Sequence, residues 1–401
     1  MITVSEAQEI VQKNLPPRQV ETAALAGSAG KILAANIAAL EPSPRYTNSA
    51  MDGFAVRWED VRHASAAQPA RLTIVGESQA GIPFWEALQP GQAARISTGA
   101  MLCAGADAVV PVEETEVEGT VLRVLKAEKQ HQHIRFAGEE FAAGAALLEA
   151  GTLLRAAQVA LLASQGIAEV PIYRPPAVSV MVTGSELVPY DAAPQPWQIR
   201  DSNGIMLRCA VESSGGVVRS SGQVGDDYQR TVAAVRQALT DSQIIIFSGG
   251  VSVGPHDLVK AAAGECGFET LFWRVRQRPG KPLFFARRGE SLFFGLPGNP
   301  VSALMCYLYY IHPVIRHLCG AAFTHHTVSG RLAQPIRNPL SRAQLFRVSL
   351  TPAGAALPEV RPLSKQASHM LTSVSDAGGF MLLDVGADLA DGEMVEVYPF
   401  I

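Results

Sequence analysis

Apolar and polar residues follow a helical pattern at the start of the chain. Residues 4–11 place apolar side chains on one helical face, and Thr3 and Glu6 before them predict a capping box. An alanine-rich stretch from about Glu21 to Ala29 predicts a second helix. Two prolines and several turn-forming residues in 41–48 then predict a linker or a domain boundary.

Short strand patterns separated by glycine and proline fill residues 50–130 and predict a small β-rich domain. The expected strands are Arg71–Val75, Ala94–Ser97, Ala108–Val112 and Thr120–Leu125. A helix is expected from Arg155 to Gln165, where Gly166 stands at the position of a C-terminal glycine.

Strand and helix patterns alternate from about residue 175 to 318, which predicts βαβ units and a parallel sheet. The expected strands are Ala177–Thr183, Val217–Ser220, Gln243–Phe247 and Ser291–Phe294. The expected helices are Ser202–Val211, Asp226–Leu239 and Val301–Leu318. Ligands of such sheets bind beyond the carboxyl ends of the strands.

After a linker-like stretch at 319–330, strand patterns return and predict a small C-terminal β-domain. The expected strands are Leu345–Leu350, Phe380–Val385 and Met394–Pro399.

Composition excludes several classes of protein. The chain has 401 residues, is 48% hydrophobic and has a formal net charge of −4, which argues against a general nucleic-acid or polybasic membrane binder. Its most apolar run, Val301–Ile311, is too short to span a bilayer. The N-terminus lacks the pattern of a signal peptide, and five widely spaced cysteines form no C-x-x-C pair, so a cytoplasmic location is expected.

Three loops could carry chemistry. Ser248–Gly254 is rich in glycine and could form an anion nest with Asp257 beside it, although a strand-to-helix turn with Asp257 as N-cap explains the same residues. Pro279 and Pro282 hold two cations, Arg278 and Lys281, in a stiff turn, as a phosphate or oxyanion site requires. A solvated surface turn is the alternative.

The third loop, Gly295–Ser302, opens the last helix of the α/β region. Asn299 and Pro300 fit an N-cap and first helical position, and a helix N-terminus also attracts anions. In the β-rich region, Asp107 is expected to be a structural turn residue. The histidines carry no clear chemistry, and G-x-S-x-G, Walker A and H-E-x-x-H motifs are absent from the sequence.

As a set, these motifs resemble the MoeA-type molybdenum insertases, the family of molybdopterin molybdotransferases related to the gephyrin E domain. The motifs are SAMDGFAV from Ser49, RISTGA from Arg95, GADAVVPVEE from Gly105, TGSEL from Thr183, DSNG from Asp201, GGVSVGPHD from Gly249, PGKP from Pro279 and GLPGNPVS from Gly295.

The resemblance implies an elongated, four-part α/β and β protein. Its parts would be a linker-like domain (1–46 with 135–174), a β-rich lid domain (47–134), an α/β molybdopterin-binding domain with a parallel sheet (175–320) and a C-terminal β-barrel (327–401). It implies a homodimer whose site lies between the α/β domain of one subunit and the lid of the other. The implied reaction takes adenylylated molybdopterin and molybdate, releases AMP and leaves molybdenum on the dithiolene sulfurs. The adenylyltransferase and a recipient molybdoenzyme are candidate partners.

Site residues follow from the same resemblance. The implied catalytic residues are Asp52, Thr98, Glu140, Glu186, Asp226, Asp257 and Lys281. The implied substrate-binding residues are Gly249, Gly250, Ser252, Gly254, Arg278, Pro300, Ser302, Arg347 and Ser368. Mg²⁺ is the implied cofactor, with Asp226 and Asp257 as ligands, since Mg²⁺ prefers oxygen donors.

The sequence departs from the family pattern at several of these motifs. Ser185 stands where the family commonly has aspartate, Glu140 is one methylene longer than the usual residue, and Pro255-His256 replaces a stretch that is often acidic. Two alternatives therefore stay open: a homologue that binds or scaffolds without full activity, and a molybdopterin adenylyltransferase.

Overall fold

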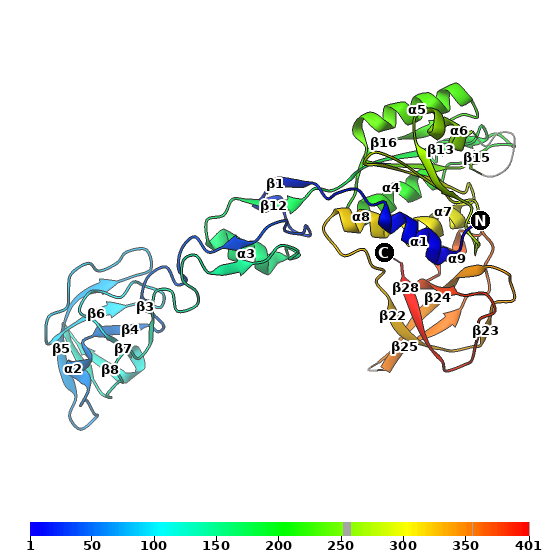
Figure 1. Cartoon of the computed structure of the whole chain (residues 1–401). Helices are drawn as coiled ribbons and strands as arrows, with labels where there is room; N and C mark the ends of the chain where they lie inside the picture. Colours follow the sequence, from blue (N-terminus) through cyan, green and yellow to red (C-terminus); the bar gives the residue numbers. More distant parts are fainter. Residues whose placement is uncertain (252–257, 355, 401) are drawn as a thin grey trace. The chain divides into compact units, whose positions relative to one another are not determined.

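The structure, a computed structural model, describes residues 1–251, 258–354 and 356–400. The chain forms two compact units (Figure 1). The first unit comprises Met1–Ala23, Gly30–Ala34 and Pro171–Ile401, and the second comprises Ala24–Ala29 and Ala35–Val170. The finer four-domain division stays a prediction.

A six-stranded mixed sheet forms the centre of the first unit, in the order β16-β13-β17-β21-β20-β18. Four neighbouring strands, β16, β13, β17 and β21, are parallel, as predicted. Two antiparallel strands that the sequence did not predict, β20 and β18, extend the sheet. The strand bounds are β16 (Val217–Val224), β13 (Ala177–Thr183), β17 (Ile244–Ser248), β21 (Ser291–Leu296), β20 (Phe284–Arg288) and β18 (Glu269–Trp273).

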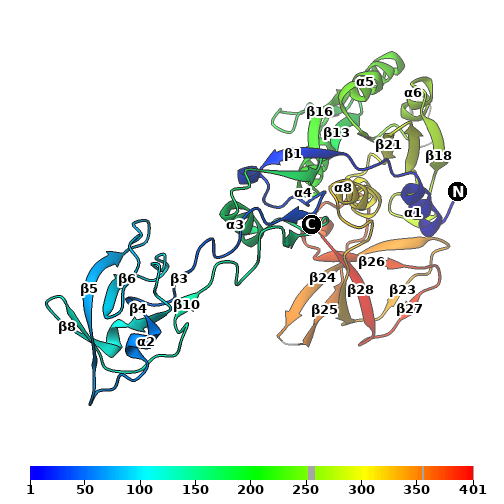
Figure 2. The ribbon, with the colours of Figure 1, turned by 60° about the vertical axis from the view of Figure 1, so that its left-hand side comes forward.

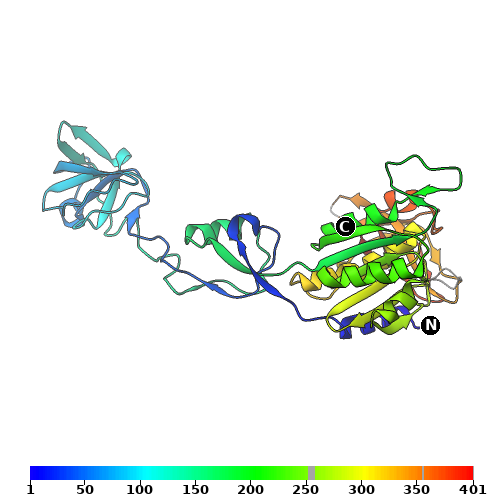
Figure 3. The same ribbon diagram turned by 90° about the horizontal axis from the view of Figure 1, so that it is seen from above.

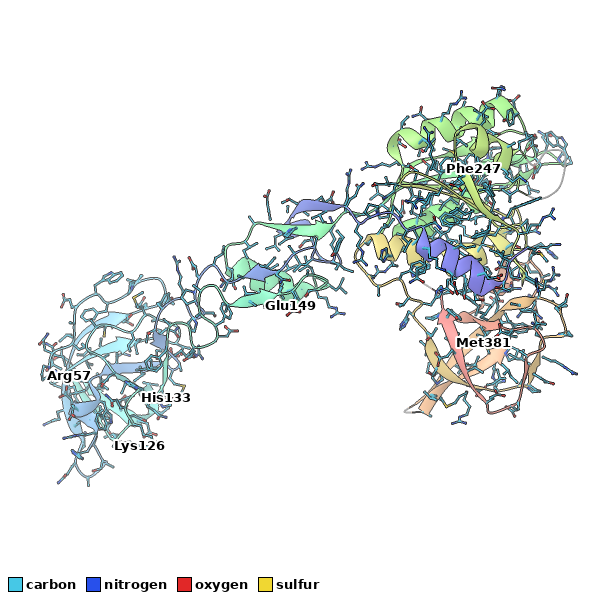
Figure 4. The ribbon with its side chains drawn as sticks, in the orientation of Figure 1. Arg57, Lys126, His133, Glu149, Phe247 and Met381 are labelled. Atoms are coloured by element: carbon cyan, nitrogen blue, oxygen red, sulfur yellow. The ribbon has the colours of Figure 1, made fainter. Side chains whose placement is uncertain are left out.

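Helices cover both faces of this sheet, because its strands are apolar on both sides. Ile244 and Ile246 pack into one core with α1 (Val4–Lys13), α4 (Asn203–Ser213), α7 (Pro300–Cys306) and α8 (His312–Leu318). Ile245 and Phe247 face the opposite way and pack with α5 (Tyr228–Asp241) and α6 (Val259–Glu265). Figure 1 labels these two helices, and Figure 4 labels Phe247. Figure 3 shows the helices of this unit running alongside the sheet. The doubly wound arrangement confirms the predicted α/β architecture.

The capping box at the start of α1 is present, with the Glu6 backbone N–H donating to Thr3 Oγ1. The predicted helix from Val301 to Leu318 is also present, but its middle is a π-helix over Tyr307–Ile311. This wider turn divides α7 from α8.

The C-terminal strands close into a five-stranded barrel, because β24 pairs with both β25 and β26 (Figure 2). Around the barrel follow β24 (Ala343–Ala353), β25 (Ala356–Pro362), β22 (Val328–Leu332), β28 (Met394–Pro399) and β26 (Gly379–Leu383). The short strand β19 (Gln277–Arg278) from the α/β region pairs with β24. Short elements beside these are β14 (Leu187–Val188), β15 (Ile199–Arg200), β23 (Ile336–Arg337), β27 (Asp388–Leu389) and α9 (Thr372–Ser375).

A six-stranded sheet in the order β7-β4-β6-β5-β9-β8 dominates the second unit and confirms the β-rich prediction. Its strands are β4 (Gly53–Val56), β5 (Ala70–Ser78), β6 (Gln92–Ile96), β7 (Ala108–Pro111), β8 (Thr115–Glu118) and β9 (Val121–Val124). Other elements are β2 (Ile37–Ala38), β3 (Asn48–Ser49), α2 (Trp58–Val61), β10 (Ile134–Arg135), β11 (Ala146–Leu148) and α3 (Ala156–Ser164).

The helix predicted from Glu21 to Ala29 is wrong. The stretch forms β1 (Val20–Ala24) and one 3₁₀ turn, Leu25–Gly27. β1 pairs with β12 (Glu169–Tyr173), and the Leu25 backbone N–H donates to Ala168 O. A pairing partner more than a hundred residues away outweighs the helix propensity of alanine.

None of the helices in the described residues is long and apolar enough to cross a membrane. All five cysteines are free thiols.

Candidate active site

In the turn after β17, two glycines leave the backbone without side chains at the carboxyl edge of the first unit's sheet. Gly249 and Gly250 have φ angles of 96° and 65°, which glycine adopts without strain. A Cβ at Gly249 would collide with Oγ1 and the carbonyl oxygen of Thr183, the last residue of β13. The Gly249 N–H donates to Leu296 O at the end of β21, 2.9 Å away. The turn therefore lies where three strand ends meet. Three further predicted positions lie outside the described residues: Ser252, Gly254 and Asp257.

Two predicted carboxylates lie beside this turn. Glu186 and Asp226 line the same cavity of about 350 Å³, together with Gly249 and Gly250. Asp226 Oδ2 accepts hydrogen bonds from the backbone N–H of Ser185 at 3.0 Å and from its Oγ at 2.5 Å. Ser185 thus orients one oxygen of Asp226.

A larger cavity of about 580 Å³ adjoins the first and shares Glu186 and Asn299 with it. One wall includes Asn203, whose Nδ2 donates to Ser248 Oγ and to Gly298 O, both at 2.8 Å. Asn203 Oδ1 is buried and has no partner among the described residues. Sequence reasoning missed Asn203 as a site residue, although the Asp201-Ser-Asn-Gly motif contained it.

The first turn of α7 contacts the C-terminal region. Pro300 occupies the first helical position, as predicted, and Asn299 is the N-cap residue, although its side chain makes no cap. Instead Asn299 Nδ2 donates to Ser368 Oγ at 3.2 Å, and the Val301 N–H donates to Ser368 O at 3.2 Å. This contact brings Ser368 to the sheet edge.

Four predicted anion-binding residues line a third cavity of about 300 Å³: Arg278, Lys281, Ser302 and Ser368. Sequence reasoning did not single out other residues of its lining, among them Gln277, Arg342 and His369. Arg342 carried no motif signal because it lies in the barrel region, far along the chain from the turn. No ion pair within the described ranges involves Arg278, Lys281 or Arg342.

Arg347 of β24 is fully buried behind this region. Its Nη2 donates to Lys365 O at 3.2 Å and Ala367 O at 3.4 Å, but its Nε and Nη1 have no partner in the described part of the chain. Burial, and then the charge of Arg278, lowers the pKa of Arg347 to about 10. A buried guanidinium with two unpaired nitrogens carries an unfavourable desolvation cost.

The three cavities adjoin one another, because each pair shares lining residues. Pro282 lines both the 300 Å³ and the 350 Å³ cavities, and His369 lines both the 300 Å³ and the 580 Å³ cavities. Arg278 and Lys281 line the 300 Å³ cavity, whereas the carboxylates of Glu186 and Asp226 line the 350 Å³ cavity. The geometry can hold two anionic groups side by side, one of them with a metal ion.

The second unit holds the remaining predicted residues. Asp52 Oδ1 accepts a hydrogen bond from the Thr98 N–H at 2.7 Å, so these two lie together. Glu140 Oε2 accepts from Ser43 Oγ at 2.6 Å. Asp107 Oδ1 accepts from the Trp58 N–H, which confirms its structural role.

The carboxylates of Glu186 and Asp226 could supply part of the coordination of a magnesium ion. Mg²⁺ is commonly held by one or two carboxylates together with substrate phosphates. Glu186 and Asp226 supply carboxylate oxygens to one cavity, while the other predicted ligand, Asp257, lies outside the described residues. Among the described residues, no group of three or more His, Cys, Asp or Glu side chains could hold a metal alone. Substrate oxygens would therefore complete the coordination.

Family models match almost the whole chain. They are described as the MoeA N-terminal region (domain I and II) over residues 2–166, a probable molybdopterin binding domain over 179–317 and the MoeA C-terminal region (domain IV) over 329–400. A molybdopterin molybdenumtransferase 2 of Mycobacterium tuberculosis is 34% identical over 398 residues, which are 98% of this chain and 97% of that protein. The chain belongs to the molybdopterin molybdenumtransferase (MoeA) family. It is also 40% identical to a Nostoc molybdopterin molybdenumtransferase over 296 residues, 73% of this chain and 68% of the relative.

Solved MoeA structures agree with this membership. The molybdopterin biosynthesis MoeA protein from Pyrococcus horikosii aligns with a TM-score of 0.87 and 30% identity, covering 100% of this chain and 99% of that one. Membership in the MoeA family confirms the predicted resemblance and the fold that it implied.

Proposed function

We propose that this protein inserts molybdenum from molybdate into adenylylated molybdopterin and releases AMP. The three adjoining cavities support this proposal most strongly, because both reactants are anions that repel each other in water. Arg278 and Lys281 supply fixed positive charge to the 300 Å³ cavity. The glycine turn at Gly249–Gly250 admits a ligand close to the backbone in the 350 Å³ cavity.

Molybdate is assigned to the 300 Å³ cavity. It is a compact tetrahedral dianion, and Arg278, Lys281, Ser302 and Ser368 surround a space of suitable size. Arg347 does not line this cavity, but its guanidinium donates to Lys365 O and to Ala367 O, directly before Ser368. Preorganised donors of this kind are each worth about 3–4 kcal/mol when a reaction develops negative charge.

The pterin nucleotide is assigned to the 350 Å³ and 580 Å³ cavities. Glu186 and Asp226 would hold Mg²⁺ there, and Ser185 keeps Asp226 oriented for that role. When bound, Mg²⁺ would neutralise phosphate charge and favour departure of AMP. Asp52, Thr98 and Glu140 contribute to activity from the second unit, and the protein works as a homodimer.

AMP release from adenylylated molybdopterin tests the proposal. We expect turnover that requires both molybdate and Mg²⁺ and that is lost in Lys281→Ala. Lys365→Ala is a matched control, because Lys365 lies next to this region but does not line the cavity. Pterin binding without AMP release would favour a scaffold, and ATP consumption with metal-free molybdopterin would favour an adenylyltransferase. A chain that is dimeric by light scattering supports the proposed assembly, and a monomer refutes it.

A further inference from the structure

Gln277 lies at the base of the turn that carries Arg278 and Lys281. It belongs to β19, is fully buried and lines the 300 Å³ cavity. A buried primary amide must be hydrogen-bonded or it destabilises the fold. Its partners therefore show what it holds in place.

The amide of Gln277 links the turn to the helix behind it. Its Nε2 donates to Gly280 O at 3.3 Å, and its Oε1 accepts from the Tyr310 hydroxyl at 2.6 Å. Because a carbonyl oxygen can only accept, Gly280 O fixes which end of the amide faces the turn. Tyr310 therefore acts as the donor to Gln277.

The turn is packed closely against these groups. Gly280 has a φ of 88°, and a Cβ there would collide with Cys306 Sγ and Gln277 Nε2. Gln277 Nε2 also lies 3.4 Å from Cys306 Sγ. The position of the turn thus depends on side chains from β19 and the α7–α8 helix.

The π-helix explains how Tyr310 comes to face Gln277. Tyr307–Ile311 forms a wider turn than an α-helix, which changes the direction of the side chains that it carries. π-helical turns often mark functional positions. Here Tyr310 is 1% exposed, and its hydroxyl meets the amide that precedes the cationic turn.

We propose that Gln277, held by Tyr310, is a positioning residue that fixes the Arg278–Lys281 turn for oxyanion binding. This inference rests on the proposed function of the 300 Å³ cavity. With the link broken, the turn would sample more conformations, and the two cations would lose part of their preorganisation. Oxyanion affinity then falls, whereas binding of the pterin nucleotide at the other cavities is retained.

Calorimetric titration of molybdate into the full chain tests the inference with Tyr310→Phe and Gln277→Met. Each variant removes the hydrogen bond between the Tyr310 hydroxyl and the Gln277 amide with little change in side-chain volume. We expect the molybdate Kd to rise about three- to tenfold in each, the size of one hydrogen bond. The double variant should bind no more weakly than the poorer single one, because the two residues act as one unit. In the AMP-release assay, the molybdate KM should rise while kcat changes little.

Tyr307→Phe is the matched control. Tyr307 is equally buried on the same π-helix, but its hydroxyl donates to Ala210 O at 2.8 Å and lies 2.7 Å from Ser214 Oγ, not near the turn. We expect Tyr307→Phe to lower the melting temperature, as we expect of Tyr310→Phe, and to keep the wild-type affinity for molybdate. Unchanged affinity in Tyr310→Phe, or equal weakening in Tyr307→Phe, would overturn the inference. If the wild type binds no molybdate, the proposed function fails and this inference falls with it.

Discussion

At the scale of single residues, Arg347 carries a positive charge that suits an anion site but that costs stability where it is buried. Its guanidinium is fully buried, and two of its nitrogen groups have no partner among the described residues. Removing a charge from water without pairing it costs several kcal/mol. We expect a dianion bound beside Arg278, whose charge acts on Arg347, to offset part of that cost.

Arg347→Met should therefore separate stability from binding. Methionine fills a similar volume without a buried charge, so the free energy of unfolding should stay within about 1 kcal/mol of wild type or rise. Molybdate should raise the melting temperature less than in the wild type. Thermal unfolding with and without molybdate measures both effects. A loss of more than about 3 kcal/mol in the absence of molybdate would show that Arg347 stabilises the fold instead.

The sequence could not reveal this burial. Arg347 was assigned to the site only through the family resemblance, and Arg342 and His369 were missed. Arg342 reaches the cavity because it directly precedes barrel strand β24, which pairs with β19 beside the cationic turn. Such a pairing joins segments more than sixty residues apart, which no local pattern reports. In contrast, Lys281 belongs to a Pro-Gly-Lys-Pro sequence, which by itself predicts a stiff turn.

At the scale of elements, the turn after β17 is a part of the site that tolerates little change. Gly249 combines a positive φ with backbone and side-chain atoms of Thr183 directly where a Cβ would stand. Its conformation and its surroundings therefore both require glycine.

Gly249→Ala should lower the free energy of unfolding by about 1–3 kcal/mol, measured by chemical denaturation. Gly264→Ala in helix α6 is the control, because its Cβ would meet no atom within 4 Å. That change should leave stability unchanged or raise it by about 0.5–1 kcal/mol. Similar losses in both variants would argue against a special role for the turn.

Local periodicity predicted most elements of the α/β region, including β13 with its bounds of Ala177–Thr183. It missed β18 and β20, which pair antiparallel at the sheet edge, and it predicted β1 as helix. β1 pairs with β12, more than a hundred residues away, and that pairing outweighs the local helix propensity.

At the scale of the whole molecule, two half-buried histidines link the stability of the first unit to pH. Burial lowers the pKa of His325 to about 4, and burial with the charge of Arg316 lowers that of His312 to about 4. Both stay neutral in the folded state, whereas unfolding lets them take up protons below their ordinary pKa of 6.5. The stability that they contribute is present above pH 6.5 and is lost as the pH falls toward 4, by about 2–4 kcal/mol per histidine.

His325→Phe should make this unit less sensitive to acid. The ring stacks on Tyr309 with centroids 4.5 Å apart, and its Nε2 is buried without a partner in the described part of the chain, so phenylalanine should fit. Urea unfolding between pH 4 and 7 should show a shallower loss of stability than in the wild type. His326→Gln changes an exposed neighbour and should keep the wild-type slope. If the free energy of unfolding of His325→Phe falls with pH as steeply as that of the wild type, His325 does not contribute to the acid sensitivity.

The most direct test of the proposed molybdate site is a crystal structure of the protein with molybdate, in which anomalous scattering locates molybdenum. We expect a molybdenum peak in the cavity bounded by Lys281, Ser302 and Ser368, with oxygens within hydrogen-bond distance of a cationic side chain. A peak only on another surface, or an empty cavity at saturating molybdate, would contradict it.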